Sequence, residues 1–199
     1  MSGKGAYPVR PRLGVLFFSS GWFREVGLQD PSSDTTARVQ AAARRAEEDL
    51  RAFCEPISTG VLFSAAEARE AARRLDAREL DGLLLAPLMW CEDQIVRAAL
   101  DELPGLPLLL WTCSPEASLP QFVPFQRMLQ GSGAVCTLQL SGMLRREGRW
   151  FRSVAGPLGD AETLRSLAAW VRALGAARRL RGLRVGVLPF RCDQMSTTY

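Results

Sequence analysis

The sequence contains no histidine, and Lys4 is its only lysine. Imidazole is the base of Ser-His and Cys-His catalysis and a frequent zinc ligand, so these mechanisms are excluded for the residues of this chain. Any proton transfer carried out by the chain would have to use carboxylates or thiols, or groups on another polypeptide segment.

Long hydrophobic runs are also missing. No stretch of 18 apolar residues occurs, and the N-terminal MSGKGAYPVRPR has no apolar segment, so the sequence predicts no membrane span and no secretory signal. The expected location is the cytoplasm. At 199 residues and 47% hydrophobic composition, the chain is long enough to bury a core without disulfides or a structural metal.

The cysteines lack the spacing of a metal site. The sequence has 5 of them and no CxxC pair, which favours reduced thiols over a disulfide framework or a zinc centre. They are Cys54, Cys91, Cys113, Cys136 and Cys192.

The net charge of +4 and the pI near 9.1 come from 25 basic and 21 acidic residues. Most of these charges alternate in sign at helical spacing, for example in residues 44–51 and 67–74, which is typical of solvated helix faces. One basic cluster stands out, without accompanying aromatic residues, so no nucleic-acid partner is predicted. It consists of Arg178, Arg179, Arg181 and Arg184.

Short apolar runs alternate along the chain with amphipathic segments. This alternation predicts a doubly wound, mostly parallel α/β sheet of flavodoxin-like or Rossmann-like type. Strands are expected at residues 12–18, 57–63, 82–88, 107–111, 150–155 and 183–190. Helices are expected at residues 35–53, 64–75, 92–103, 121–146 (broken at Pro124 and at 131–133) and 160–174.

The end of the chain bears on domain organisation. Residues 1–11 are expected to be a disordered tail, residues 12–175 an α/β domain, and residues 183–199 the first strand of a second, truncated α/β domain after a linker at 175–182. The alternative is that residues 183–190 form the last edge of a complete six-stranded sheet.

Ligands of open parallel sheets bind at the carboxyl ends of the strands. Here Trp22, Trp90 and Trp111 fall at such ends, among hydroxyl and charged residues, a composition that suits a sugar or another polyol. Each also has a structural interpretation, because tryptophan often covers a core. Gln139 lies in an apolar helical stretch and needs a partner there, either a side chain or the backbone. Gly131-Ser132-Gly133 follows a helix rather than a strand, so it is not a nucleotide-binding turn.

Four segments together resemble the N-terminal domain of the L-fucose/L-arabinose isomerase family, and the similarity spans nearly the whole chain. The order and spacing of the segments carry the resemblance, since each alone is degenerate. They are SSGWFREVG (19–27), LMWCEDQIVRAAL (88–100), PLLLWTCSPEASLP (107–120) and CTLQLSGMLRREGRWFRSVAGPLGD (136–160).

The resemblance implies a metal-dependent aldose–ketose isomerase. Its divalent ion, usually manganese, and its catalytic carboxylates belong to later domains of the family, so no catalytic or metal-binding residue is expected in this chain. The N-terminal domain would contact the sugar in a neighbouring subunit of a homotrimer or homohexamer.

The family's substrate contacts carry over to four positions. Trp22 lies in the loop after the first strand, Arg24 and Trp90 match positions of fucose-type members, and Gln139 matches a glutamine of arabinose-type members. Those arabinose-type members have a histidine where this chain has Gly142, which weakens L-arabinose as the substrate.

Two other functions fit the sequence. A non-catalytic sugar-binding module would use the same strand ends. A two-cysteine racemase of the aspartate/glutamate type would use Cys91 and Cys113 as opposed thiol bases.

Overall fold

Five apolar segments form a parallel sheet in the computed structural model, which describes residues 10–29, 33–75, 77–118, 121–181 and 183–186. The strand order is β2-β1-β3-β4-β5, and every neighbouring pair is parallel. The order reverses beside β1, as in flavodoxin-like sheets, so the predicted doubly wound class is confirmed. The strands are β1 (Arg12–Phe18), β2 (Glu55–Leu62), β3 (Gly82–Pro87), β4 (Leu108–Ser114) and β5 (Phe151–Pro157).

The central strands are apolar along their whole length because helices cover both faces of the sheet. All of β3 is buried, and β1 is buried from Leu13 onward. The edge strands β2 and β5 are largely half-buried or exposed. In β2 an extra residue near Gly60, whose φ is +83°, shifts the register against β1.

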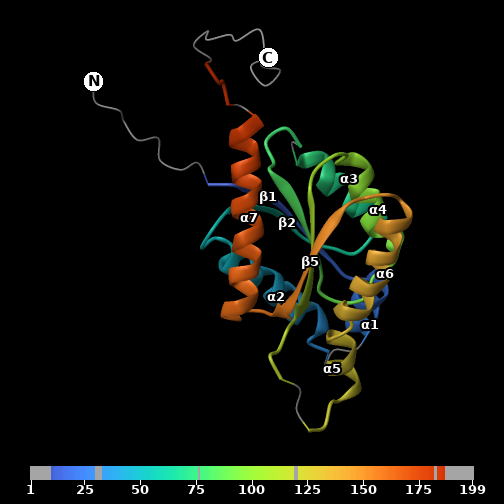
Figure 1. The fold of residues 1–199 in the computed structure, drawn as a ribbon. Helices are drawn as coiled ribbons and strands as arrows, with labels where there is room; N and C mark the ends of the chain where they lie inside the picture. Colours follow the sequence, from blue (N-terminus) through green and yellow to red (C-terminus); the bar gives the residue numbers. More distant parts are fainter. Residues whose placement is uncertain (1–9, 30–32, 76, 119–120, 182, 187–199) are drawn as a thin grey trace.

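The helices form two layers, one on each side of the sheet (Figure 1). On one side α2 and α7 pack against alternate residues of β1, β3 and β4. On the other side α3, α4 and α6 pack against the remaining residues of these strands. The bounds are α2 (Thr35–Leu50), α3 (Ala65–Arg74), α4 (Asp93–Glu102), α6 (Gly133–Arg146) and α7 (Ala161–Arg181).

Two short helices, α1 (Gly21–Gln29) and α5 (Phe125–Gln130), lie near the carboxyl ends of the strands, at the bottom of Figure 1. The predicted break in the helical stretch 121–146 is confirmed: residues 131 and 132 separate α5 from α6, while Gly133, also expected in the break, is the first residue of α6. The expectation of a loop after the first strand was wrong, since α1 occupies it. Its 9 residues span less than three turns, too few for a helical repeat of apolar residues to stand out.

The last helix is longer than predicted. We expected residues 160–174 followed by a linker, but α7 continues through Gly175 to Arg181. Glycine at this position is explained by packing, because a Cβ on Gly175 would come within 3.0 Å of Cγ of Pro11.

The second-domain strand stays a prediction. Residues 183–186 have no regular structure, and residues 187–199 lie outside the described residues. Most of the predicted N-terminal tail, residues 1–9, lies outside them as well.

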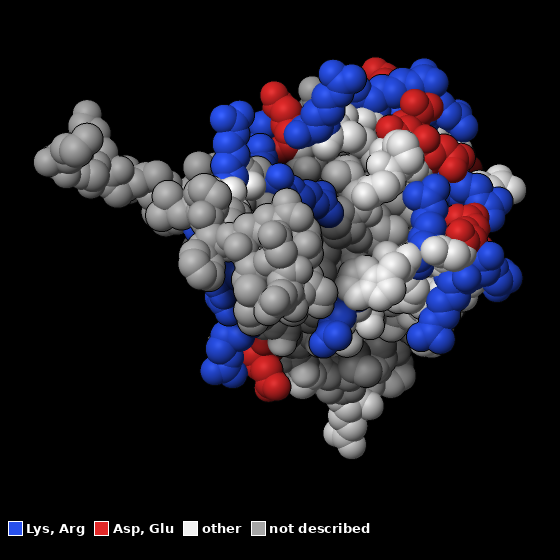
Figure 2. All heavy atoms as spheres, turned by 45° about the horizontal axis from the view of Figure 1, so that its top comes forward, with Lys and Arg blue, Asp and Glu red and all other residues white. Residues whose placement is uncertain are grey.

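Charged side chains surround the amino-terminal edge of the sheet, where Arg residues lie beside Asp and Glu (Figure 2). Arg12 pairs with Glu55 at 3.5 Å and with Glu79. Arg178 of α7 pairs with Asp81 at 3.2 Å. Ion pairing between elements thus accounts for part of the high arginine content. None of the helices in the described ranges is long and apolar enough to cross a membrane.

Candidate functional site

The loops after β1 and β3 meet at the point where the strand order reverses. The amide of Ser20 donates to the carbonyl oxygen of Trp90 at 3.0 Å, and the amide of Leu88 donates to the carbonyl oxygen of Phe18 at 2.9 Å. These bonds hold the start of α1 against the segment that carries Trp90. We call Ser20, Trp90, Glu92, Asp93 and Gln139 the Trp90 cluster.

Two of the four predicted substrate contacts bind each other inside this cluster. The indole Nε1 of Trp90 donates to Oε1 of Gln139 at 2.9 Å, and Nε2 of Gln139 donates to Oδ1 of Asp93 at 2.7 Å. The partners that Gln139 requires are therefore side chains rather than backbone. The chain of bonds fixes α6 to the start of α4 and orients the Trp90 ring.

Ser132 gives the Gly131-Ser132-Gly133 motif its role. Its hydroxyl accepts the Trp90 amide at 2.9 Å. A Cβ on Gly133 would overlap the carbonyl oxygen of Pro87 and lie 3.2 Å from that of Leu88. Glycine thus allows the first turn of α6 to touch the backbone at the end of β3.

Two buried oxygens at this edge of the sheet lack a hydrogen-bond partner among the described residues. The Ser20 hydroxyl donates to Oε1 of Glu92 at 2.9 Å, while Oε2 of Glu92 is buried and unpartnered. The hydroxyl of Ser19, a residue only 1% exposed, is unpartnered as well. Unsatisfied buried polar atoms are costly, so a hydrogen-bond partner that reaches either oxygen would be stabilising.

The other two predicted contacts lie on α1. Arg24 forms an ion pair with Glu67 at 2.8 Å, and its guanidinium carbon lies 4.7 Å from the centre of the Phe63 ring. Trp22 is 53% exposed, and its ring makes an edge-on contact with Phe23. The structure thus brings Trp90 and Gln139 into contact and joins the first residues of α1 to them, while Arg24 is engaged by α3.

Trp111 has a structural role. It is fully buried, and its Nε1 donates to the carbonyl oxygen of Gly156 at 3.3 Å. The structural interpretation of this tryptophan is therefore the right one. Of the three tryptophans predicted at strand ends, Trp22 and Trp90 remain as candidate aromatic surfaces for a ligand.

The cysteines are not arranged as opposed bases. Cys91 and Cys113 are buried in core clusters on opposite faces of the sheet. Burial raises the pKa of the Cys113 thiol to about 12, and contact with Cys136 (Sγ–Sγ 3.5 Å) together with burial raises the pKa of Cys91. This geometry does not support the racemase alternative.

A metal centre does not fit the described residues, in which no group of three or more Asp, Glu or Cys side chains could hold an ion. Asp93 and Glu92 are the carboxylates of the Trp90 cluster, and each is already bonded to a neutral side chain. The divalent ion implied by the resemblance therefore has no set of ligands in this part of the chain.

Sequence reasoning missed a second feature of the carboxyl edge. A cleft of about 250 Å³ lies between α2, α5 and the ends of β3, β4 and β5. Three arginines line it, Arg38 and Arg45 from α2 and Arg127 from α5. Arg38 and Arg45 are seven residues apart and share one side of a helix. Arg45 lies in the mixed-charge stretch 44–51, which is typical of a solvated helix face, and no sequence pattern indicates a role for Arg38. We call this feature the arginine cleft.

Comparison with known proteins adds no relative. No protein-family model matches the chain, and a search of curated proteins found no match. The resemblance to the isomerase family therefore stays a hypothesis that rests on the residues quoted for it.

Proposed function

We propose that this chain is the substrate-contacting domain of an aldose–ketose isomerase similar to the L-fucose/L-arabinose isomerases, and that it binds the sugar at the Trp90 cluster. One observation carries the proposal. The partly exposed Trp90 and Glu92, whose buried Oε2 has no partner among the described residues, both follow β3 at the point where the strand order reverses, the usual ligand position of such sheets.

The chemistry of this edge suits a polyol. An aromatic ring packs against the apolar face of a sugar, and a carboxylate oxygen accepts hydrogen bonds from its hydroxyl groups. Oε2 of Glu92 and the hydroxyl of Ser19, which precedes the Glu92-bound Ser20, are buried and lack a partner among the described residues. In the proposal, sugar hydroxyls that reach these atoms would supply the missing hydrogen bonds.

The proposal divides the reaction between two parts of an assembly. Aldose–ketose isomerisation moves hydrogen between adjacent carbons, and a metal ion polarises the two oxygens. The described residues provide binding groups and no set of metal ligands, so a neighbouring subunit or later domain would supply the ion and the base. A homo-oligomer, a trimer or hexamer, follows as part of the proposal.

The test is a titration of the chain with L-fucose, L-arabinose and the corresponding ketoses, followed by ligand-observed NMR. We expect saturable binding that Trp90→Ala abolishes. Trp150→Ala is the matched control, because Trp150 is 72% exposed at the far end of β5. The absence of saturable binding for all these sugars, or an equal loss in both variants, would contradict the proposal.

A non-catalytic sugar-binding module is the second candidate, because it would use the same Trp90 cluster and needs no metal ion. Reading the coding sequence beyond Tyr199 separates the two. An in-frame continuation rich in Glu, Asp and His ligands would support the isomerase, whereas sugar binding without such a continuation or a partner chain would support the module.

A further inference from the structure

The arginine cleft presents more positive charge than its own carboxylates neutralise. Of the residues that line it, Arg38, Arg45 and Arg127 are cationic, and Glu116 is anionic. Arg127 is paired with Glu116, and Arg38 with Asp34 one turn earlier. Arg45 forms no ion pair with a described residue.

The environment of Arg45 explains why it is left without a carboxylate. Asp49, one turn later on α2, accepts the amide of Gly159 at 2.9 Å instead. Among the described residues, the Arg45 guanidinium makes a single hydrogen bond, to the carbonyl oxygen of Leu158 at 3.5 Å. That distance is at the long limit for a hydrogen bond, so most of its donors are available.

A buried side-chain amide links Arg127 to Asp34, the ion-pair partner of Arg38. Gln130 is only 6% exposed. Its Oε1 accepts from Arg127 at 3.4 Å, and its Nε2 donates to Asp34 at 3.4 Å. Both bonds are longer than the usual 2.9–3.0 Å, so the amide and the guanidinium groups could form shorter bonds with a ligand in the cleft.

From these contacts we propose that the arginine cleft binds a phosphate group, either as inorganic phosphate or as part of a small phosphorylated metabolite. Guanidinium groups form bidentate hydrogen bonds with phosphate oxygens, and several converging arginines match a tetrahedral dianion better than a planar carboxylate. The cleft of about 250 Å³ has room for the phosphate group and for part of the metabolite to which it is attached. The apolar lining from Val39, Leu88 and Leu158 would lower the local dielectric constant and strengthen the attraction.

This site is separate from the proposed sugar site and does not depend on it. The Trp90 cluster is built on the segments after β1 and β3 and on α4 and α6. The arginine cleft is built on α2, α5 and the turns after β4 and β5, and it also includes Leu88, two residues before Trp90. A substitution in one site should leave binding at the other site intact. A negative result for sugar binding therefore does not decide whether phosphate binds, and the reverse also holds.

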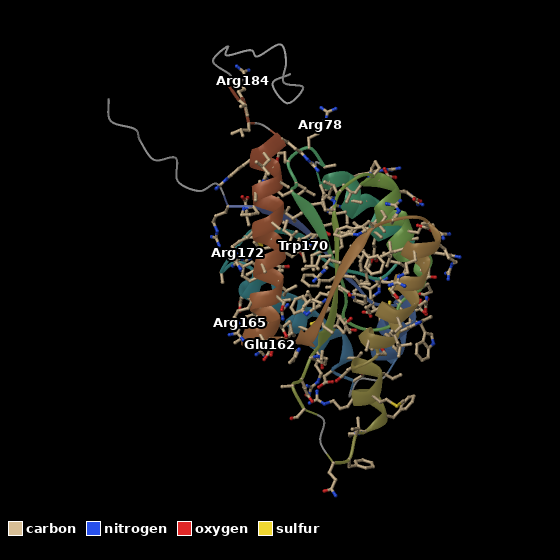
Figure 3. The ribbon with its side chains drawn as sticks, in the orientation of Figure 1. Arg78, Glu162, Arg165, Trp170, Arg172 and Arg184 are labelled. Carbon is tan, nitrogen blue, oxygen red and sulfur yellow. The ribbon has the colours of Figure 1, made fainter. Side chains whose placement is uncertain are left out.

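The test is calorimetric titration of the full chain with inorganic phosphate, with chloride at matched ionic strength as the baseline. Arg45→Gln should weaken binding about tenfold, because it removes a charge-assisted hydrogen-bond donor. Arg172→Gln is the matched control, because Arg172 projects from the outer side of α7, away from the sheet (Figure 3). Equal weakening in both variants, or a phosphate response no larger than that of chloride, would overturn the proposal.

A variant that gains affinity guards against loss by misfolding. Glu116→Gln removes the carboxylate that occupies Arg127, so we expect phosphate to bind several-fold more tightly than to the wild type. Unchanged or weaker binding in this variant would count against the cleft as the site.

A further arm identifies the source of the phosphate group. The site would be assigned to a phosphorylated metabolite if a phosphorylated aldose binds more tightly than inorganic phosphate, and if Arg45→Gln leaves the binding of the free aldose unchanged. Equal affinities would assign it to free phosphate. Loss of phosphate binding in Arg45→Gln but not in Trp90→Ala is expected in either case, and the reverse pattern would overturn the proposal.

Discussion

The two halves of the carboxyl edge differ in how far the protein satisfies its own polar groups. In the Trp90 cluster, short hydrogen bonds of 2.7–2.9 Å connect Trp90, Gln139 and Asp93. The hydrogen-bonding capacity left unused there belongs to single buried oxygens, such as Oε2 of Glu92. In the arginine cleft two arginines form close ion pairs, but the bonds of Gln130 and Arg45 are 3.4–3.5 Å long. Arg45 has no carboxylate partner among the described residues. A pre-ordered cluster positions a ligand with little reorganisation, whereas the cleft attracts through charge and would tighten on binding.

The contrast depends on the close approach of α6 to β3, so the largest effect is expected at Gly133. Gly133→Ala places a methyl group against the Pro87 carbonyl oxygen and should reduce the free energy of unfolding by about 3 kcal/mol. Urea denaturation measures this change.

Gly142→Ala is its control on the same helix. A Cβ there would lie 3.4 Å from the mobile end of Arg146, and the better helix propensity of alanine should stabilise by about 0.5–1 kcal/mol. If both variants changed stability in the same direction, the close approach would not be what fixes α6.

The bond between Trp90 and Gln139 should show energetic coupling. In a double-mutant cycle of Trp90→Phe and Gln139→Leu, we expect a coupling free energy of about 1 kcal/mol, because either single change leaves a partly buried partner unsatisfied. Urea denaturation of the four proteins measures it. Pairing Trp90→Phe with Gln94→Leu, on the exposed side of α4, should give no coupling, and a similar value in both cycles would refute the cluster.

The smallest effect concerns the turn that borders the arginine cleft. Asp160 accepts the amide and hydroxyl of Thr163, both at 2.7 Å, and these bonds lower the pKa of Asp160 below its ordinary 3.8. The stabilisation is complete at pH values above 3.8 and is lost as the pH falls toward the lowered folded-state pKa. In Asp160→Asn the melting temperature should therefore fall less steeply as the pH is lowered below 3.8 than it does in the wild type.

Glu162→Gln, in the first turn of α7 (Figure 3), controls for the removal of a negative charge from the same turn. An identical acid limb in the wild type and in Asp160→Asn would show that the cap at Asp160 does not contribute.

The sheet could be predicted because its central strands are apolar throughout. The start of α3 could be predicted because Ser64-Ala65-Ala66-Glu67 has the pattern of a helix capping box. The Ser64 hydroxyl accepts the Glu67 amide at 3.2 Å. The α1 helix could not be predicted because it is short. The predicted end of α7 was wrong because Gly175 allows close packing against Pro11 and does not end the helix. Local pattern does not distinguish these uses of glycine.

The candidate site was predictable in part. Trp90 and Gln139 were both selected from the sequence, but their mutual bond joins residues 49 positions apart, a separation that periodicity does not encode. The arginine cleft escaped prediction for a related reason. Arg45 lies in a stretch of alternating charge that is typical of a solvated helix face, and nothing in the sequence indicates that Arg127 and Gln130 approach α2 from α5.

The two outer strands also bear on aggregation. A long, flat outer strand invites pairing with another chain, and natural proteins interrupt such strands with proline, charge or bulges. Here β2 carries Pro56 and the register shift near Gly60, while β5 carries the exposed Arg152 and ends at Pro157. Each interruption breaks the regular ladder that an incoming strand would need, so copies of this domain should resist strand-to-strand association at high concentration, and any assembly they form should use helix surfaces instead.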